Sequence, residues 1–345
     1  MQNKLKILFF INGLEVGGAE RVFVADANAL QERGFEVHFA SFVRGPLAKE
    51  LVLPAERVHE TRSVWSLARL LHKHRIQILY TTLNEANAMG RLAALFAPGL
   101  RLYTRESNMS DTKSLRFRLL DVVLGWRSTR IIAVSRAVGE SLARYAPHLV
   151  RKITLLYNGV PVMMNYSLKG SSFVNQVRLL CVASLTYKKD QAILLRALAL
   201  LPERYSLTLI GDGSWRGVLE NLAKELKIES RVRFLGSVPY EKVVEEYKTH
   251  DIFVLPSQFE GCPNVVSEAQ SFAMPTVAFD IPGMREFVSE RSGILVKERE
   301  PQALAAAIEQ AAANAAALGQ SGFEEVRTNR SQETHLQKLM QILGL

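Results

Sequence analysis

The fold of this chain is indicated most clearly by residues 251–280, which read DIFVLPSQFEGCPNVVSEAQSFAMPTVAFD. The apolar runs at 251–255 and 276–279 are typical of strands that are buried on both faces, as in a parallel sheet. Between the two runs, glycine and proline indicate a loop, Asn264 suits the cap of a helix, and apolar residues follow at helical spacing. The stretch therefore predicts a strand, a loop, one helix and a second strand.

Two glutamates in this stretch are candidates for binding a ligand. Glu260 is expected in the loop after the first strand, and Glu268 about one turn into the helix, on the side of Asn264. Carboxylates accept hydrogen bonds from sugar hydroxyls, while the amides at the start of a helix bind phosphate. The pair therefore fits a nucleotide sugar. Acidic side chains are usually exposed, however, so the pair alone also fits an ordinary surface.

The length and the composition fit two domains. The 345 residues exceed the size of one average core, and a hydrophobic content of 48% supports extensive burial. No apolar run approaches the roughly 20 residues of a membrane span, and Met1 is followed by a strand pattern rather than by a signal peptide. We therefore expect a cytoplasmic protein. Cys181 and Cys262 are the only cysteines, which indicates neither a disulfide framework nor a cysteine metal site.

Strand-like and helical patterns alternate through both halves of the chain. The strand-like runs lie at 6–11, 37–42, 76–81, 101–104, 131–135, 153–157, 177–183, 206–210, 232–235, 251–255, 276–279 and 293–296. Such alternation predicts parallel sheets wrapped by helices, an α/β fold. A polar, poorly periodic segment separates a predicted first domain, 1–165, from a second, 166–330. Residues 331–345 are expected to form a helix that packs on the first domain.

Basic residues are concentrated in the first half. Residues 1–170 carry 24 Lys and Arg against 13 Asp and Glu, a net charge of +11, whereas the remainder carries 19 against 21, or −2. This asymmetry indicates an anionic partner such as phospholipid head groups, a lipid-linked pyrophosphate or nucleic acid, although surface arginines are also simply common. Residues 113–130 read as a basic amphipathic helix, which fits the inner face of a membrane, although docking on a sheet is the simpler explanation. Nucleic acid is least favoured, because no aromatic motif is interleaved with the basic residues.

Several loops are expected to line a cleft, because ligands of parallel sheets bind beyond the carboxyl ends of the strands. Gly17 and Gly18 lie between the first strand and its helix, where they would let a ligand approach the backbone. Arg105 and Glu106 follow the strand-like run at 101–104, and Gly211 follows another strand. A plain turn or a surface ion pair would also explain these residues.

The string at 251–280 resembles the signature of the retaining family-4 glycosyltransferases, which have the GT-B fold of two Rossmann-like domains facing across a cleft. In that family a Glu, seven further residues and a second Glu follow a buried strand, and Glu260 and Glu268 match those positions. The string GGAERV at 17–22 is similar to the family's opening loop, near the donor phosphates and the acceptor. The resemblance covers nearly the whole chain and implies that Glu268 binds the donor ribose and Glu260 the donor sugar.

Two positions depart from the family's pattern. Many relatives carry a His just after the strand at 101–104, where this chain has Arg105 and Glu106, and one of these two is expected to fill part of that role. Within ASLTYKKD at 183–190 the family has an Arg and a Lys that neutralise the donor diphosphate. Lys189 fits the Lys, but Ser184 stands where the Arg is expected. Lys188 or a residue of the basic half would compensate for the missing cation.

The resemblance implies a retaining glycosyltransferase that moves a hexose or N-acetylhexosamine from a nucleotide sugar, with UDP favoured, to a saccharide or lipid-linked acceptor in bacterial-type cell-surface glycan synthesis. No Asp-x-Asp string ends a strand and no metal-ligand spacing is present, so neither a metal nor a cofactor is expected. A nucleotide-sugar epimerase of the same fold and a non-catalytic glycan- or membrane-binding subunit stay as alternatives. The predicted catalytic residues are Glu260, Lys189 and Glu106, the predicted donor-binding residues are Gly17, Gly18, Ser184, Lys189, Gly211, Asn264, Val265 and Glu268, and the predicted acceptor-side residues are Arg105 and Glu106.

Overall fold

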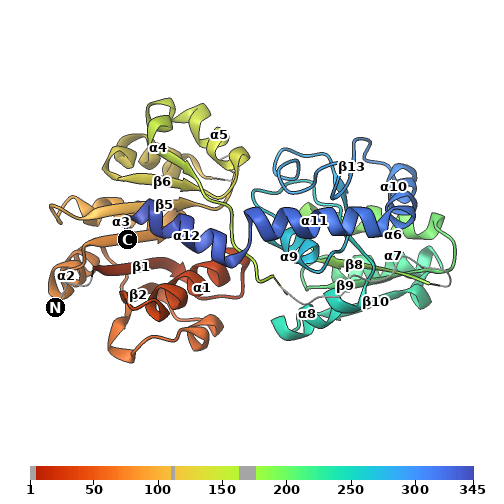
Figure 1. Cartoon of the computed structure of the whole chain (residues 1–345), viewed down its shortest axis with the longest axis horizontal. Coiled ribbons are helices and arrows are strands. Elements are labelled where there is room, and N and C mark those ends of the chain that lie inside the picture. The colour runs from red at the N-terminus through yellow and green to blue at the C-terminus, as the bar shows by residue number, and fades with distance from the viewer. Residues whose placement is uncertain (1–4, 110–112, 163–175) are drawn as a thin grey trace. The chain divides into compact units, whose positions relative to one another are not determined.

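The computed structural model describes residues 5–109, 113–162 and 176–345, which form two compact units (Figure 1). The first unit consists of residues 1–159 and 333–345, and the second of residues 160–332. The predicted domain boundary between residues 165 and 166 lies outside the described residues. The first unit is thus built from both ends of the chain.

The first unit is a seven-stranded parallel sheet with helices on its faces. Its elements are β1 (Lys6–Gly13), α1 (Gly18–Glu32), β2 (Glu36–Val43), β3 (Val58–Glu60), α2 (Val64–His74), β4 (Ile78–Thr82), α3 (Asn84–Ala94), β5 (Arg101–Glu106), α4 (Leu115–Leu124), β6 (Arg130–Ala133), α5 (Arg136–Tyr145), β7 (Ile153–Leu155) and, from the end of the chain, α12 (Gln332–Leu343). The strand order is β3-β2-β1-β4-β5-β6-β7.

The second unit repeats this architecture with six parallel strands. Its elements are β8 (Val177–Val182), α6 (Gln191–Leu200), β9 (Tyr205–Ile210), α7 (Arg216–Glu225), β10 (Val232–Gly236), α8 (Tyr240–Thr249), β11 (Ile252–Leu255), α9 (Asn264–Ser271), β12 (Thr276–Phe279), β13 (Gly293–Val296), α10 (Pro301–Ala313) and α11 (Ala315–Asn329). The order β10-β9-β8-β11-β12-β13 matches the first six strands of the other sheet, and both follow the Rossmann pattern. The predicted α/β class with two Rossmann-like sheets is confirmed.

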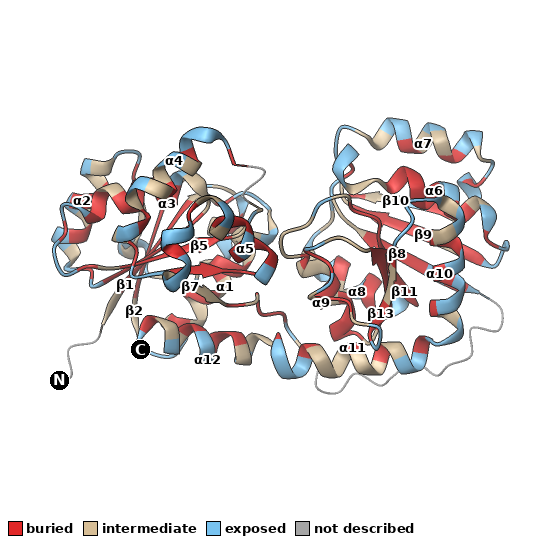
Figure 2. Ribbon diagram, turned by 90° about the horizontal axis from the view of Figure 1, so that it is seen from above, coloured by how far each residue is buried: buried red, intermediate tan, exposed pale blue. Residues whose placement is uncertain are grey.

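The first sheet is buried on both faces, as its continuous apolar strands require. Successive side chains of β1 point to opposite faces: Phe9 packs with α1 and α12 on one side, and Leu8 packs with α2 and α3 on the other. Figure 2 shows the buried residues of each unit concentrated in the central strands and in the helix faces against them.

Strand β3 is the element that the sequence pattern did not predict. It has only three residues, Val58–Glu60, and it pairs with β2 at the edge of the sheet through Phe39, Ala40 and Ser41. A strand this short gives no readable alternation, so its formation is decided by the neighbouring strand.

The helix α12 belongs to the core of the first unit. Leu336, Leu339 and Leu343 are buried in the apolar cluster around β1 and α1. Burying one leucine side chain contributes about 1.5–3 kcal/mol. The ring of His335 is also buried, and its Nε2 atom lies 2.9 Å from Oδ1 of Asp26 on α1. The C-terminal segment is therefore an integral part of this unit.

The helices are of ordinary length for a globular protein. The helices α1 and α11 have 15 residues each, whereas a bilayer span needs about 20. Within the ranges that the structure describes, no helix combines the length and the apolar character needed to cross a membrane.

Candidate functional site

The second unit offers a candidate site where its strand order reverses. From β8 the chain proceeds outward through β9 to β10 and then returns to form β11 on the other side of β8. The strands are parallel, so their carboxyl ends share one edge, and the loops that leave β8 and β11 diverge there. Open α/β sheets bind their ligands in the resulting crevice.

Three side chains at this edge form what we term the carboxyl-edge group: Lys189, Ser257 and Glu260. The Nζ atom of Lys189 lies 2.5 Å from Oε1 of Glu260, and Oγ of Ser257 donates a 2.6 Å hydrogen bond to the same oxygen. The side chains of Lys189 and Glu260 keep 25% and 10% of their surface exposed. The structure thus brings together the lysine and the first glutamate that the sequence predicted, in positions that solvent reaches.

An arginine outside the sequence motifs ties the two loops of this group to each other. One loop carries the short 3₁₀ turn Tyr187–Lys189 and continues to Asp190, and the other begins at Pro256. The Nη2 atom of Arg299 lies 2.8 Å from Oδ2 of Asp190, and the same guanidinium donates to the carbonyl oxygens of Pro256 and Ser257 at 3.0 and 3.2 Å. Its five N–H groups in a fixed fork suit such bridging, and they fix the spacing of the two loops.

Two glycines permit close approaches between backbone segments at this edge. Gly211, after β9, has φ of +126°, and an added Cβ would lie 2.1 Å from the carbonyl oxygen of Ala183. Gly283, after β12, would place a Cβ 1.9 Å from the carbonyl oxygen of Glu260. Larger residues do not fit at either position, so the loops after several strands pack directly against each other here.

The second predicted glutamate, Glu268, lies on α9 and contacts the buried Tyr247 of α8. The hydroxyl of Tyr247 donates a 3.0 Å hydrogen bond to Oε2 of Glu268. Burial, followed by the charge of Glu268, raises the pKa of Tyr247, so the phenol stays protonated and keeps donating. This contact fixes one carboxylate oxygen of Glu268.

The start of α9 differs from the prediction. The helix begins at Asn264, and Pro263 occupies the capping position with a φ of −78°, so the prediction of Asn264 as the cap is wrong. Proline is pre-organised for this place because its ring fixes φ and it has no N–H that would need a partner. Asn264 and the following Val265 are partly exposed in the first turn of the helix.

The other predicted donor-binding residues are spread over both units. Ser184 is exposed after β8, and its carbonyl oxygen accepts a 3.0 Å hydrogen bond from Nε2 of Gln191. In the first unit Gly17 precedes α1 and Gly18 begins it, at the carboxyl end of β1. These positions agree with the loops in which the sequence placed them.

The location expected for Arg105 and Glu106, in a loop after a strand, is wrong. Both are part of β5, which continues to Glu106 because Arg105 pairs with Thr82 of β4 and Glu106 pairs with Ala133 of β6. Their side chains are 1% and 3% exposed. They therefore lie in the interior of the first unit rather than on a loop surface.

Glu106 belongs to a buried network of two carboxylates and two cations. The Nζ atom of Lys113 lies 2.5 Å from Glu106 Oε2 and 2.8 Å from Asp121 Oδ2, and Arg91 pairs with both acids. Burial acts to raise the pKa of Asp121, but Arg91 and Lys113 outweigh it, and the pKa is lowered. Burial likewise opposes the charge of Lys113, but Glu106 and Asp121 raise its pKa. Asp121 and Lys113 therefore keep their charges inside the protein, where they form ion pairs with Arg91 and Glu106.

Arg105 is held by a separate set of partners on the other side of the sheet. Its guanidinium donates to the side chain of Asn158 and lies 3.8 Å from Oδ2 of Asp26, which in turn contacts His335 of α12. Arg105, Asp26 and His335 have at most 1% of their surface exposed. This arrangement joins β5, α1 and the C-terminal helix.

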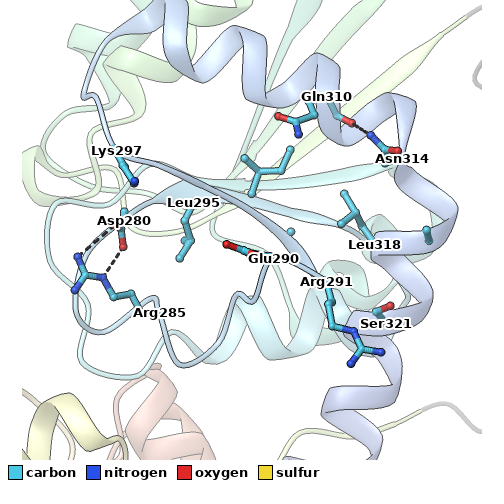
Figure 3. Close-up of a pocket in the computed structure, with 13 residues that line it drawn as sticks. Asp280, Arg285, Glu290, Arg291, Leu295, Lys297, Gln310, Asn314, Leu318 and Ser321 are labelled. Carbon is cyan, nitrogen blue, oxygen red and sulfur yellow. Dashed lines mark hydrogen bonds and ion pairs between the residues drawn. The ribbon is translucent and has the colours of Figure 1, made fainter.

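A pocket of about 840 Å³ lies elsewhere in the second unit, beside β12 and β13 (Figure 3). An ion pair of 2.6 Å joins Arg285 and Asp280 at one end, while Glu290 and Arg291 lie along the lining. Its lining includes none of the site residues predicted above, all of which the structure describes. The pocket mixes acidic and basic side chains without a dominant charge, and we assign no ligand to it.

Sequence motifs missed three residues that shape the site. Ser257 is the second residue after β11 and contacts Glu260, whereas Tyr247 and Arg299 come from other elements altogether. Ser257 could have been found as a hydroxyl three residues before the glutamate, in the same loop. The other two carry no local signal, because their contacts exist only in the folded unit.

Comparison with known families agrees with this geometry. The sequence profile described as Glycosyltransferase Family 4 matches residues 16–162, and the profile described as Glycosyl transferases group 1 matches residues 168–324. The chain belongs to glycosyltransferase family 4. Together the two matches cover both units, and the GT-B fold expected of a family-4 glycosyltransferase is the fold observed.

Individual relatives of this family-4 glycosyltransferase span most of its length. An uncharacterized glycosyltransferase of Methanocaldococcus jannaschii is 25% identical over 280 residues, which cover 77% of this chain and 67% of the relative. The UDP-Gal:alpha-D-GlcNAc-diphosphoundecaprenol alpha-1,3-galactosyltransferase of Escherichia coli is 24% identical over 317 residues, 82% of this chain and 81% of the relative. The crystal structure of Anabaena HepE in complex with UDP has a TM-score of 0.87 at 21% identity and covers 99% of this chain and 100% of its own.

The buried network predicts that Glu106 acts mainly on stability. Glu106→Gln leaves an uncompensated positive charge in the interior, so we expect the free energy of unfolding to fall by about 3 kcal/mol in urea titrations. The exposed Glu140 on α5 supplies a control, and Glu140→Gln should stay within about 0.5 kcal/mol of the parent chain. A Glu106→Gln chain that keeps its stability and loses only turnover would contradict this interpretation and would point to contact with the substrate.

Proposed function

We propose that this family-4 glycosyltransferase transfers a hexose or N-acetylhexosamine from a nucleotide sugar, with UDP as the favoured nucleotide, to a saccharide or lipid-linked acceptor in the synthesis of cell-surface glycans. The observation that carries the proposal is the contact between Lys189 and Glu260 at the strand reversal of the second unit. A cation and a carboxylate meet there on the loops after two neighbouring strands, next to the start of α9. The names of the E. coli relative and of the UDP complex of HepE support this donor class.

In the proposed arrangement each group has a distinct task. The carboxylates of Glu260 and Glu268 accept hydrogen bonds from the hydroxyls of the donor hexose and of the ribose. The ammonium of Lys189 and the first amides of α9 face the diphosphate, whose charge increases as it leaves. Lys189 is well suited to this task because Glu260 holds it in position before the donor arrives.

We propose that the transfer retains the anomeric configuration and needs no metal. The bond between the anomeric carbon and the phosphate oxygen breaks, and the acceptor oxygen bonds to the same face of the anomeric carbon. The acceptor proton passes to the leaving phosphate oxygen, so no side chain has to act as the base. Arg105 and Glu106 would support this scheme through the stability of the first unit, because both are buried there and paired with residues outside β5.

The donor assignment is tested by a thermal-shift screen of nucleotide sugars, in which a bound donor raises the melting temperature. We expect UDP-sugars to give the largest shift and Glu268→Ala to weaken donor binding by about 10- to 100-fold, since hydrogen bonds to a charged group contribute about 1.5–3 kcal/mol. Glu225→Gln is the control, because this exposed carboxylate lies at the far end of α7 in the same unit. An undiminished donor shift in a folded Glu268→Ala chain would refute the ribose assignment.

The role of Lys189 can be separated from that of a general surface charge by using its neighbour. Lys188 lies in the same 3₁₀ turn but is exposed, whereas Lys189 contacts Glu260. Lys189→Gln should lower kcat by about 100- to 1000-fold, because a fixed cation near the leaving group acts mostly in the transition state. Lys188→Gln should stay within a few-fold of the parent. The kcat of both variants is measured with a coupled assay that follows release of the nucleotide diphosphate. An equal loss of kcat in the two variants would exclude the assigned role of Lys189.

We further propose that the first unit binds an anionic membrane surface through α4. If the apolar residues of this segment served only to pack the helix on the sheet, they would be buried. Instead, Leu115 and Leu119 are 81% and 61% exposed, and Val123 and Trp126 are also exposed. The first unit also carries most of the excess positive charge. A lipid-linked acceptor would be presented at such a surface.

Sedimentation with vesicles tests the membrane contact. The parent chain should co-sediment with phosphatidylglycerol vesicles at low salt more than with phosphatidylcholine vesicles, and added salt should release it. Leu115→Ser combined with Leu119→Ser should abolish most of this binding. Val218→Ser, which changes an exposed apolar residue of the second unit, should not. Equal sedimentation with both lipids would rule out the proposed surface.

A further inference from the structure

Three histidines of the first unit meet at the edge of its sheet, away from the residues discussed above. His38 lies on β2, His59 on the short edge strand β3, and His74 is the last residue of α2. One ring nitrogen from each lies within 4.8 Å of the other two. The chain therefore places three imidazoles around one point, although they come from three different elements.

Strand register explains why the rings converge. In β2 the side chains of His38 and Ala40 point to the same face, and His59 is the residue paired with Ala40. That face is covered by α2, since Ala40 packs with Leu67 and Leu71 of this helix. The end of α2 then brings His74 over the two strands, with ring centroids 4.8 and 4.9 Å from those of His38 and His59.

The spacing of His38 and His59 fits two ligands of one transition-metal ion. The Nδ1 atom of His38 lies 3.2 Å from Nε2 of His59. Two nitrogens at about 2.0–2.1 Å from a tetrahedral Zn²⁺ ion are separated by about 3.3 Å. A direct hydrogen bond between the two rings explains that one distance, but it does not explain why a third imidazole lies beside both.

A carboxylate is placed to orient one of the ligands. Oε1 of Glu36 lies 3.3 Å from Nε2 of His38, on the opposite side of the ring from His59. With its Nε2–H donated to Glu36, His38 presents the lone pair of Nδ1 to the other histidines, and metal-binding histidines are usually oriented by a carboxylate in this way. Lys6, Arg57 and Lys73 are the nearby cations that act against a bound cation, and Lys6 is paired with Glu36 at 2.8 Å.

Burial keeps the imidazoles in the neutral form that binds metal. It lowers the pKa of all three rings, and that of His59 to about 4, with the neighbouring histidines lowering it further. His38 is buried, whereas His59 and His74 are partly exposed. An ion can therefore reach the cluster from solvent past His59 and His74.

We propose that His38, His59 and His74 form a binding site for a divalent transition metal such as Zn²⁺. Three imidazoles bind this class of ion and leave the fourth position to water. The site lies toward the amino ends of the strands, because His38 is the third residue of β2 and His74 ends the helix that precedes β4. Nucleotide-sugar sites lie at the carboxyl ends. The ion would thus fasten the edge strand β3 to β2 and α2 and would take no part in sugar transfer.

The test uses the full-length chain without a polyhistidine tag, freed of metal with a chelator and then dialysed. Equilibrium dialysis with ZnCl₂ should show one tightly bound ion per chain, and saturating Zn²⁺ should raise the melting temperature by about 5–10 °C at a 100-fold excess over the dissociation constant. Mg²⁺ should give no shift, because it prefers oxygen ligands. Co²⁺ in place of Zn²⁺ should give the visible absorption of a tetrahedral nitrogen-rich site.

Matched variants separate this cluster from surface histidines. His59→Gln and His74→Gln should each weaken Zn²⁺ binding by at least about tenfold and abolish the Co²⁺ absorption. His72→Gln is the control, since His72 lies on α2 but contacts the carbonyl oxygen of Phe96 instead of the cluster. His74→Gln changes a partly exposed residue at a helix end, so it tests the proposal even if His59→Gln fails to fold. Absence of tight Zn²⁺ binding by the parent chain, or equal binding by all folded variants, would overturn the proposal, whatever the result for sugar transfer.

Discussion

The parallel pairing of β8 with β11 is the interaction on which the candidate donor site depends. Leu179 pairs with Ile252 and Leu180 with Phe253, so the carboxyl ends of the two strands are fixed side by side. This pairing brings together Lys189 and Glu260, which lie 71 positions apart in the sequence. A shift of the register by one residue would turn every side chain of a strand to the opposite face and would separate the two loops. The chemistry at the sheet edge is therefore decided by the burial of apolar strand residues below it.

The two units hold charged side chains in different ways, and the difference separates scaffold from site. In the first unit, Arg91, Glu106, Lys113 and Asp121 neutralise each other away from water, where losing one partner leaves a costly buried charge. In the second, the pair of Lys189 and Glu260 stays partly exposed at the ends of strands. Only the second kind of pair can exchange its partner for a ligand at low cost.

The sequence predicted the features that depend on local pattern. Continuous apolar runs identified the long buried strands, and the two glutamates of residues 251–280 identified the edge at which Glu260 and Lys189 meet. The sequence-based prediction failed where contacts with neighbouring strands decide the local structure. The end of β5 depends on hydrogen bonding to β4 and β6, so Arg105 and Glu106 were expected in a loop.

The cluster of His38, His59 and His74 is a second case of this limit. Its members are far apart in sequence and none stands in a spacing typical of metal ligands, so no local pattern predicts their contact. His74 lies beside Lys73 and Arg75, a polar context that is typical of a solvent-facing helix surface. Only the register of β3 against β2, together with the end of α2, brings the three rings to one place.

The contribution of α12 to the first unit has a consequence for how the protein is made. Chains usually fold domain by domain as they leave the ribosome, starting from the N-terminus. Here the first 159 residues emerge early, but Asp26 and the apolar surface beside α1 await His335, Leu336 and Leu339, which follow the second unit in the sequence. The second unit is a single continuous segment, residues 160–332, and needs no such wait. The N-terminal unit therefore reaches its native core only after the whole second unit has been translated, so the order of completion is the reverse of the order of synthesis.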